Sequence, residues 1–222
     1  MSAKELFLYC SFNLKQVGYD DGILEKLGGT SQTEAYIASI WTHLQTNYCH
    51  STLGSKVLVE RLPVIKHYSG MNLRADGPSL ESMYANTVND LNGADLMLYM
   101  GYDSIGGGNA GVAYLGKVCR NDQDYKKQSI SVYHTQISFM GYLLAHEVGH
   151  NLGMSHDFAP KHGGNGGPCD KKGIMSYGGL YQWSECSVND FTEHYNKYKS
   201  NWCLPGMYTY ICTYFRYICT LG

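Results

Sequence analysis

No apolar run in the 222-residue sequence reaches the roughly 18 residues that a membrane-spanning helix needs. The 17 basic and 19 acidic residues give a net charge of −2, which argues against nucleic acid as a partner and against binding to an anionic membrane surface. No Cys-x-x-Cys pair occurs, so we do not expect a zinc site made of cysteines. No Asn-x-Ser/Thr sequon occurs either, and N-glycosylation therefore gives no sign of secretion.

The length and composition fit one globular domain, or one domain with a small appendage. A hydrophobic content of 44% is enough for a core. Eight cysteines in a chain of this size indicate an oxidising compartment. Their pairing cannot be deduced from the sequence, because eight cysteines allow too many combinations.

Residues 146–157 read HEVGHNLGMSHD and contain three closely spaced histidines. His146 and His150 are four residues apart and share one face of a helix, so both imidazoles can reach one metal ion. Gly153 tolerates the positive φ that ends a helix, and the turn can return His156 as a third ligand. Three histidines leave a fourth zinc position open, as a catalytic site needs. The pattern therefore predicts a catalytic zinc site.

Glu147 follows the first histidine, and its carboxylate can lie close to the metal without being a ligand. We therefore expect Glu147 to be the general base. The alternative for H-E-x-x-H alone is a helix with two surface histidines. The third histidine, with a glycine before it, argues against that alternative. Residues 137–145 (ISFMGYLLA) are apolar enough to form a buried helix, a rigid element on which a metal site can be held in place.

A second motif, GIMSYG, occupies residues 173–178. The extended histidine motif with this downstream methionine turn resembles the metzincin metalloproteases. Asp157, directly after the third histidine, is similar to the adamalysin or reprolysin branch (peptidase family M12B), which includes snake-venom metalloproteases and disintegrin-type metalloproteases. The resemblance implies that Met175 lies beneath the zinc as a hydrophobic floor; the alternative for Met175 is ordinary core packing. It also implies structural roles for Gly153 and for Asp157, which we expect to accept hydrogen bonds from nearby backbone.

The resemblance implies an α/β fold: a metzincin catalytic domain with a mixed twisted sheet, long helices and a smaller irregular C-terminal lobe, with zinc in the cleft between. We expect this reprolysin-like domain at residues 3–205, followed at 206–222 by a strand-like tail or read-through from non-coding sequence. Helices are expected at residues 35–48 and 79–91, and strands at residues 5–12, 56–68 (interrupted by Pro63), 94–100 and 129–133.

Two segments resemble the substrate-binding parts of the family. An edge strand offers unpaired N–H and C=O groups with which an extended peptide can pair, although a plain edge strand is the alternative. The segment after the methionine turn is implied to line the pocket beyond the scissile bond. The residues in these two segments are Gly111, Val112, Ala113, Tyr114, Ser176, Tyr177 and Gly178.

The resemblance also implies two disulfides, Cys119 with Cys203 and Cys169 with Cys186. It leaves four cysteines unassigned, which are Cys10, Cys49, Cys212 and Cys219.

Some relatives bind a structural calcium ion in addition to the single catalytic Zn²⁺. Glu5 matches one calcium-ligand position, but Asn92 stands at the companion acidic position. Pro205-Gly206 replaces the usual asparagine region after the last family cysteine. These departures put Ca²⁺ in doubt.

The function implied is a secreted, monomeric zinc endopeptidase that hydrolyses extracellular matrix or plasma proteins, or a venom component, with a zinc-activated water and Glu147 as base. One alternative is a non-catalytic toxin or binding domain that kept the fold. Another is a metal-dependent hydrolase of small amides, which the open edge strand argues against. The sequence has no signal-peptide pattern and no pro-segment. We therefore expect the mature part of a precursor or an incomplete reading of the gene.

Overall fold

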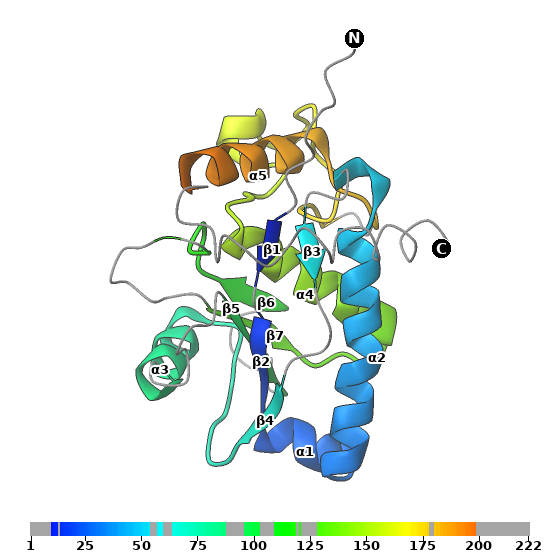
Figure 1. Ribbon diagram of the computed structural model, residues 1–222, viewed down its shortest axis with the longest axis vertical. Helices are drawn as coiled ribbons and strands as arrows, with labels where there is room; N and C mark the ends of the chain where they lie inside the picture. The colour runs from blue at the N-terminus through cyan, green and yellow to red at the C-terminus, as the bar shows by residue number, and fades with distance from the viewer. Residues whose placement is uncertain are drawn as a thin grey trace.

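The computed structural model describes residues 10–12, 14–53, 57–59, 64–87, 96–102, 109–118, 120, 128–177 and 180–198. Five strands form a mixed sheet in the order β4-β2-β5-β7-β6 (Figure 1). They are β2 (Leu14–Asp20), β4 (Val64–Tyr68), β5 (Leu96–Gly101), β6 (Gly111–Ala113) and β7 (Gln128–Val132). A second sheet pairs β1 (Cys10–Phe12) in parallel with β3 (Val57–Val59). The expected α/β class is confirmed.

The larger sheet is parallel except at one edge. β2 pairs in parallel with β4 and β5, and β5 pairs in parallel with β7. β6 runs antiparallel to β7, with Gly111 opposite Ser131 and Ala113 opposite Ser129. β6 is the last strand in the order, so its outer edge pairs with no other strand of the described residues.

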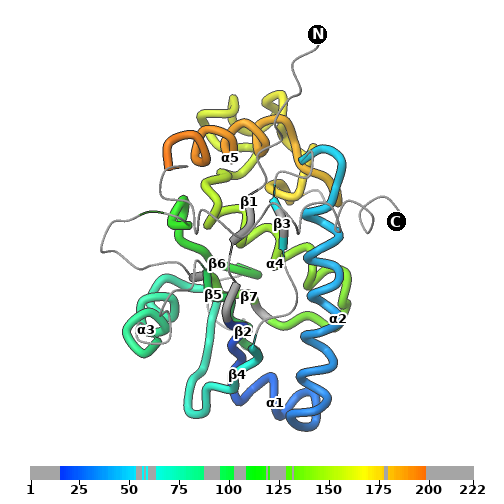
Figure 2. The backbone as a smooth tube through the Cα atoms, in the orientation of Figure 1, coloured from blue at the N-terminus to red at the C-terminus, as the bar shows by residue number. Residues whose placement is uncertain are grey.

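Helices cover both faces of the sheet (Figures 1 and 2). Strand β5 explains this layering, because successive side chains of a strand point to opposite faces. Leu96, Leu98 and Met100 lie in the core cluster with α2 and α4, whereas Met97 and Tyr99 lie in the cluster with α3. The helices are α1 (Asp21–Leu27), α2 (Thr30–Tyr48), α3 (Gly77–Thr87), α4 (Ile137–Asn151) and α5 (Glu185–Tyr198), with short 3-10 helices at Ser51–Leu53 and Pro160–His162.

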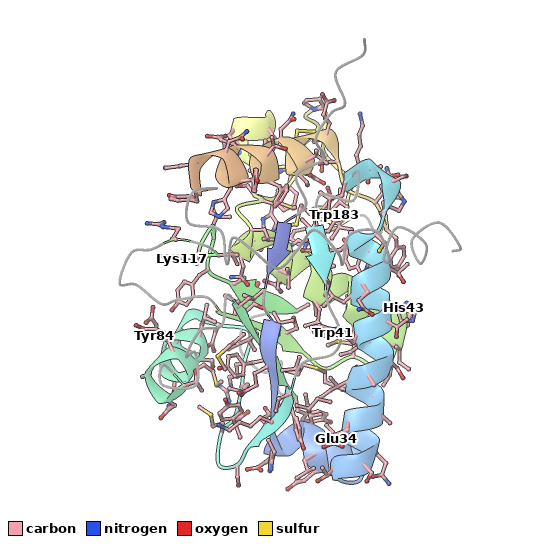
Figure 3. All side chains as sticks on the ribbon, viewed as in Figure 1. Glu34, Trp41, His43, Tyr84, Lys117 and Trp183 are labelled. Carbon is pink, nitrogen blue, oxygen red and sulfur yellow. A yellow bond between two sulfur atoms is a disulfide. The ribbon has the colours of Figure 1, made fainter. Side chains whose placement is uncertain are left out.

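The chain after α4 forms a smaller lobe whose main regular element is α5. Trp183 anchors this lobe to the end of α2 (Figure 3). Its indole Nε1 donates to the Asn47 carbonyl at 2.8 Å, and its ring centroid lies 4.9 Å from that of Tyr48. A disulfide between Cys169 and Cys186 ties the loop of the lobe to the first turn of α5. The two lobes are therefore packed onto one another.

The beginning of the long second helix was predicted incorrectly. The helix expected at residues 35–48 begins at Thr30, and the helix α1 before it was not predicted. Gly28 ends α1 in the left-handed conformation at φ 87°, and Gly29 is the N-cap of α2 without a side-chain hydrogen bond. Two glycines therefore separate two helices.

The single strand expected at residues 56–68 is two strands, β3 and β4, which belong to different sheets. β4 lies at the edge of the larger sheet opposite β6. The strands expected at residues 94–100 and 129–133 correspond to β5 and β7 with small shifts at their ends. Residues 5–9 of the first expected strand and the tail at 206–222 lie outside the described residues.

The helix expected at residues 79–91 begins two residues earlier, at Gly77. The Asp76 carboxylate accepts the Ser79 N–H at 2.7 Å and so satisfies an N–H group of the first turn. Among the described residues, no helix is both long enough and apolar enough to cross a membrane.

Leu44→Ala should destabilise the fold, because Leu44 is fully buried on α2 in the cluster that also contains α4. We expect the free energy of unfolding to fall by about 2–5 kcal/mol, measured by urea denaturation. Ser39→Ala on the exposed face of the same helix is the control and should change it by less than about 0.5 kcal/mol. Equal effects of the two substitutions would contradict the assigned core.

Candidate metal centre and active site

Helix α4 carries His146 and His150 and ends at Asn151, before the turn that leads to His156. Its C-cap is Leu152, and the following Gly153 has φ +94° and donates its N–H to the His150 carbonyl at 2.9 Å. A Cβ at Gly153 would also lie only 2.7 Å from the Cβ of His194 on α5. Glycine is therefore required both by the backbone conformation and by the packing, and the turn brings His156 back toward the helix.

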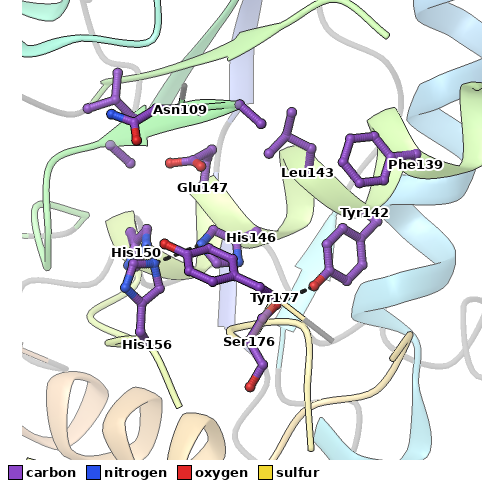
Figure 4. Close-up of a pocket in the computed structure, with 14 residues that line it drawn as sticks. Asn109, Phe139, Tyr142, Leu143, His146, Glu147, His150, His156, Ser176 and Tyr177 are labelled. Atoms are coloured by element: carbon purple, nitrogen blue, oxygen red, sulfur yellow. Dashed lines mark hydrogen bonds between the residues drawn. The ribbon is translucent and has the colours of Figure 1, made fainter. Parts of the chain in front are cut away.

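The three imidazoles converge on one point (Figure 4). Nε2 of His156 lies 3.2 Å from Nε2 of His146 and 3.1 Å from Nε2 of His150. Nδ1 of His146 donates to the Ile174 carbonyl at 2.7 Å, and Nδ1 of His150 donates to the Met154 carbonyl at 2.8 Å. A carbonyl only accepts, so each of these two rings keeps its proton on Nδ1 and turns the Nε2 lone pair inward.

Burial also keeps the two helix-borne imidazoles neutral. It lowers the pKa of His146 to about 4 and the pKa of His150 to about 3, with further lowering from the neighbouring histidines. Zn–N bonds of about 2.0–2.1 Å in tetrahedral geometry place the nitrogens about 3.3 Å apart, close to the spacings here. The donor set therefore fits one zinc ion, which His146, His150 and His156 could hold.

Glu147 is 3% exposed and faces the same pocket as the histidines (Figure 4). Burial raises its pKa to about 8, and a bound cation would shift that pKa back down. Its Oε2 atom is buried and has no hydrogen-bond partner among the described residues. A Cβ at Gly111 would overlap the other carboxylate oxygen, so the carboxylate occupies space that only glycine leaves. The unpaired oxygen is available to a water or a substrate in the pocket.

Asp157 is fully buried and joins the third-ligand loop to the smaller lobe. Its carboxylate accepts hydrogen bonds from the hydroxyls of Ser176 and Ser187, both at 2.9 Å, and from that of Ser184. Its N–H donates to the Met175 carbonyl at 3.0 Å. The donors to the carboxylate are serine hydroxyls, where the sequence analysis expected backbone N–H groups. Hydrogen bonds to a charged acceptor are the stronger kind, so the loop is held firmly.

Met175 is fully buried against the metal helix. Its sulfur lies 2.7 Å from the position that a Cβ of Gly149 would take, so the side chain packs directly onto α4. The preceding residue, Ile174, presents its carbonyl to both His146 Nδ1 and the Tyr142 hydroxyl. The methionine turn therefore contributes a buried thioether and a backbone acceptor to the site.

Two residues that were not predicted from the sequence, His162 and Asp190, support the loop that carries His156. His162 Nδ1 donates to the His156 carbonyl at 2.9 Å, and its Nε2 lies 3.2 Å from Asp190 Oδ1. Asp190 Oδ2 accepts the Ser155 N–H at 2.8 Å. Asp190 is also paired with Lys161, whose Nζ is 2.7 Å from Oδ1. Asp190 therefore holds the Ser155 N–H directly and the His156 carbonyl through His162, and no motif in the sequence indicates this.

The pocket around the histidines has a volume of about 510 Å³. β6 and the residues before it form one wall, and α4 and the segment after Met175 form the other. Besides the histidines and Glu147, its lining residues are Asn109, Ala110, Gly111, Val112, Ala113, Phe139, Tyr142, Leu143, Ser176 and Tyr177. The α4 residues were predicted only as part of a buried helix, although their spacing of three to seven residues before His146 places them on neighbouring helix turns.

Tyr114 does not line the pocket. Its side chain packs against the core cluster that contains Leu80 and Met83, and its carbonyl accepts Asn151 Nδ2 at 2.8 Å. Cys49 is disulfide-bonded. Several predictions concern residues outside the described part of the chain or, for Cys10, a side chain outside it: Glu5, Cys10, Asn92, Cys119, Gly178, Cys203, Pro205, Gly206, Cys212 and Cys219.

The folded chain should bind one zinc ion, and His156→Ala should weaken that binding by more than about 100-fold, since even outer-shell changes often cost 10–100-fold. Competition with a chromophoric chelator measures the affinity. The control is His67→Ala, which removes a histidine that pairs with Asp21 at 2.7 Å outside the pocket. Equal zinc affinity in both variants would be incompatible with the three-histidine site.

Comparison with known proteins agrees with this geometry. The family model described as metallopeptidase family M12B, reprolysin-like, matches residues 34–157, more than half of the chain. A human disintegrin and metalloproteinase domain-containing protein 9 is 36% identical over 104 residues, covering 44% of this chain and 11% of that protein. Zinc metalloproteinase-disintegrin-like atrase-B of Naja atra is 32% identical over 95 residues, covering 40% and 14% respectively.

A Bombyx mori protein described as "a disintegrin and metalloproteinase with thrombospondin motifs like" is 34% identical over 106 residues, or 42% of this chain. The matches take up only 11–15% of the length of these relatives. A solved structure titled "Structure of a chaperone-substrate complex" aligns with a TM-score of 0.58 at 14% identity over 84% of this chain and 38% of that chain, which bears on the fold alone. With a metzincin fold and the M12B match over more than half of its length, the chain belongs to the reprolysin-like family of zinc-dependent metallopeptidases.

Proposed function

We propose that this chain is a secreted zinc-dependent endopeptidase that hydrolyses peptide bonds in proteins. The observation that carries the proposal is the convergence of three imidazole Nε2 atoms beside the buried carboxylate of Glu147. A structural zinc site would be closed by a fourth protein ligand, and no fourth ligand completes this cluster among the described residues. The three-histidine cluster would instead leave one coordination position of the zinc open for water or substrate, next to Glu147 as the base.

The position of β6 supports a peptide rather than a small amide as substrate. β6 is the edge strand of the sheet and lines the pocket over its whole length. An extended peptide can pair with the N–H and C=O groups of such an edge, which holds its backbone across the histidines. The pocket between α4 and the Ser176–Tyr177 segment can then take one side chain of that peptide. A strand-like substrate of several residues uses all of these features.

The chain's own residues move the proton in this proposal. When bound, the zinc ion supplies Lewis acidity, which polarises a peptide carbonyl and lowers the pKa of water. Glu147 removes one proton from the attacking water as its oxygen bonds to the carbonyl carbon. Glu147 then delivers that proton to the amide nitrogen as the C–N bond breaks, which leaves an amine and a carboxylic acid that releases its own proton to solvent. Gly111 leaves the space in which the Glu147 carboxylate is held.

Secretion is supported by the Cys169–Cys186 disulfide, because such bonds persist in oxidising compartments. Matrix or plasma proteins, or the targets of a venom component, are the substrates we propose. The Naja atra relative named as a zinc metalloproteinase supports the choice of protein substrates.

Glu147→Gln should abolish cleavage of a denatured protein substrate while zinc remains bound. Loss of general acid–base catalysis costs about 100- to 10,000-fold in rate, and glutamine keeps the size of the side chain. Fluorogenic cleavage and metal analysis of the same sample measure the two properties. Glu34→Gln, on the exposed face of α2, is the matched control and should leave the rate unchanged. A folded, zinc-loaded parent without activity would instead favour a non-catalytic binding domain.

Gly111→Ala should lower kcat by at least about tenfold without loss of zinc. The new methyl group would push the Glu147 carboxylate away from its position, and a misplaced catalytic group lowers the rate. Steady-state kinetics and the zinc content measure this effect. Gly77→Ala is the control, since a Cβ at that position meets no atom within 4 Å. An unchanged kcat in Gly111→Ala would contradict the role of Gly111 in leaving space for the Glu147 carboxylate.

A further inference from the structure

Two buried serines on β7 carry hydroxyl groups that the proposed mechanism does not use. Ser129 and Ser131 are 1% and 0% exposed, and neither Oγ atom has a hydrogen-bond partner in the part of the chain that the structure describes. The two residues point to the same face of the sheet and lie about 6.6 Å apart along the strand. A buried hydroxyl without a partner destabilises a fold, so two of them beside an active site need an explanation.

Both serines point to the side of the sheet on which α4 packs. Leu98 pairs with Ser129 and Met100 pairs with Ser131 across β5 and β7, and residues paired in this way point to the same face. Leu98 and Met100 belong to the core cluster that contains the buried side of α4, whereas Ile130 belongs to the cluster that contains α3. The two hydroxyls therefore lie on the face of β7 that packs against α4.

Ser131 is the serine next to the Glu147 carboxylate. It stands opposite Gly111 on β6, whereas Ser129 stands opposite Ala113. A Cβ at Gly111 would overlap Glu147 Oε1, so the carboxylate lies where the Gly111 side chain would be (Figure 4). Opposite residues of an antiparallel pair have Cβ atoms only about 4.5–5.5 Å apart. The Glu147 carboxylate therefore replaces the cross-strand side chain that Ser131 would otherwise meet.

The two unpaired groups are chemically complementary. Glu147 Oε2 is buried without a partner among the described residues, and an oxygen of an ionised carboxylate only accepts hydrogen bonds. The Ser131 hydroxyl can donate, and rotation about its Cα–Cβ bond moves the oxygen without moving the strand. A hydrogen bond between them would pair one buried donor with one buried acceptor, and hydrogen bonds to a charged group are the stronger kind.

We propose that Ser131 is a positioning residue for the general base: its hydroxyl donates a hydrogen bond to the Glu147 carboxylate and fixes it in the space that Gly111 leaves. This inference rests on the proposed function, because the position of the carboxylate matters for turnover only if Glu147 transfers a proton. Ser131 does not line the pocket, so it acts through Glu147 and not on the substrate. A serine present only for its small size would be replaced by alanine without loss of activity.

The test compares Ser131→Ala with Ser129→Ala in the zinc-loaded full chain, with a fluorogenic peptide as substrate. Ser131→Ala should lower kcat about tenfold while KM and the zinc content stay as in the parent, because a misplaced base slows proton transfer without changing substrate binding. Ser129→Ala removes an equally buried hydroxyl from the same face of the same strand, but opposite Ala113, and should keep the parent kcat.

Thermal melting of the same samples gives a second measure that needs no turnover. Removing a hydroxyl that bonds to Glu147 leaves the carboxylate without its donor, so Ser131→Ala should lower Tm by about 2–6 °C. Removing a hydroxyl that has no partner takes away an unsatisfied buried group, so Ser129→Ala should melt at or above the temperature of the parent.

The inference is overturned if Ser131→Ala keeps the parent kcat. It is also overturned if both serine variants lose kcat equally, since a general disturbance of β7 has that result. If the parent cleaves no peptide, the endopeptidase proposal fails and the melts decide on the contact alone. A lower Tm in Ser131→Ala but not in Ser129→Ala then supports the hydrogen bond to Glu147, and a Tm at or above that of the parent refutes it.

Discussion

The site depends on the position of two protons. His146 and His150 each direct Nδ1–H to a backbone carbonyl, which turns the lone pairs of Nε2 toward one another and toward His156. Nε2 of His156 lies 3.2 Å from Nε2 of His146 and 3.1 Å from Nε2 of His150, so a cation could lie between the three nitrogens. Burial makes protonation of His146 and His150 unfavourable, so a proton is a poor substitute for that cation. The rest of the structure has to hold these three side chains close together.

The smaller lobe supplies most of that restraint. The Ile174 carbonyl orients His146. The Asp157 carboxylate accepts hydrogen bonds from the hydroxyls of Ser176 in the methionine turn, Ser184 just before α5 and Ser187 on α5. Asp190 on α5 holds the Ser155 N–H, and His162 holds the carbonyl of His156. These contacts act on the loop from several directions, so the third ligand is fixed although it lies on no helix. The disulfide between Cys169 and Cys186 adds a covalent tie to the same lobe.

The metal ligands could be predicted from the sequence because their spacing is a local property of one helix and one turn. The support from Asp190 could not, since its main partner near the ligand is a backbone N–H, which almost every residue carries. Tyr114 was grouped with the three residues before it, but its side chain packs into the other core cluster. Helix α1 was missed although Asp20 accepts the Ile23 N–H as its N-cap, because a helix of seven residues is too short to show a periodic pattern. Local spacing brings the three histidines together as predicted, and the Cys169–Cys186 pair that the family resemblance implied is present, whereas the contacts of Asp190 and Tyr114 depend on the tertiary fold.

A site of this kind weakens the fold that carries it. A buried polar atom without a partner, such as Glu147 Oε2, costs about 1–3 kcal/mol. The well-packed contact of α2 with α4, where Ile40, Leu44 and Tyr48 are fully buried, offsets this cost from the other side of the metal helix. An ion that binds the folded chain and not the unfolded chain adds stability by mass action. The unpaired carboxylate oxygen remains after the ion binds, so that part of the cost is relieved only by a hydrogen bond to that oxygen.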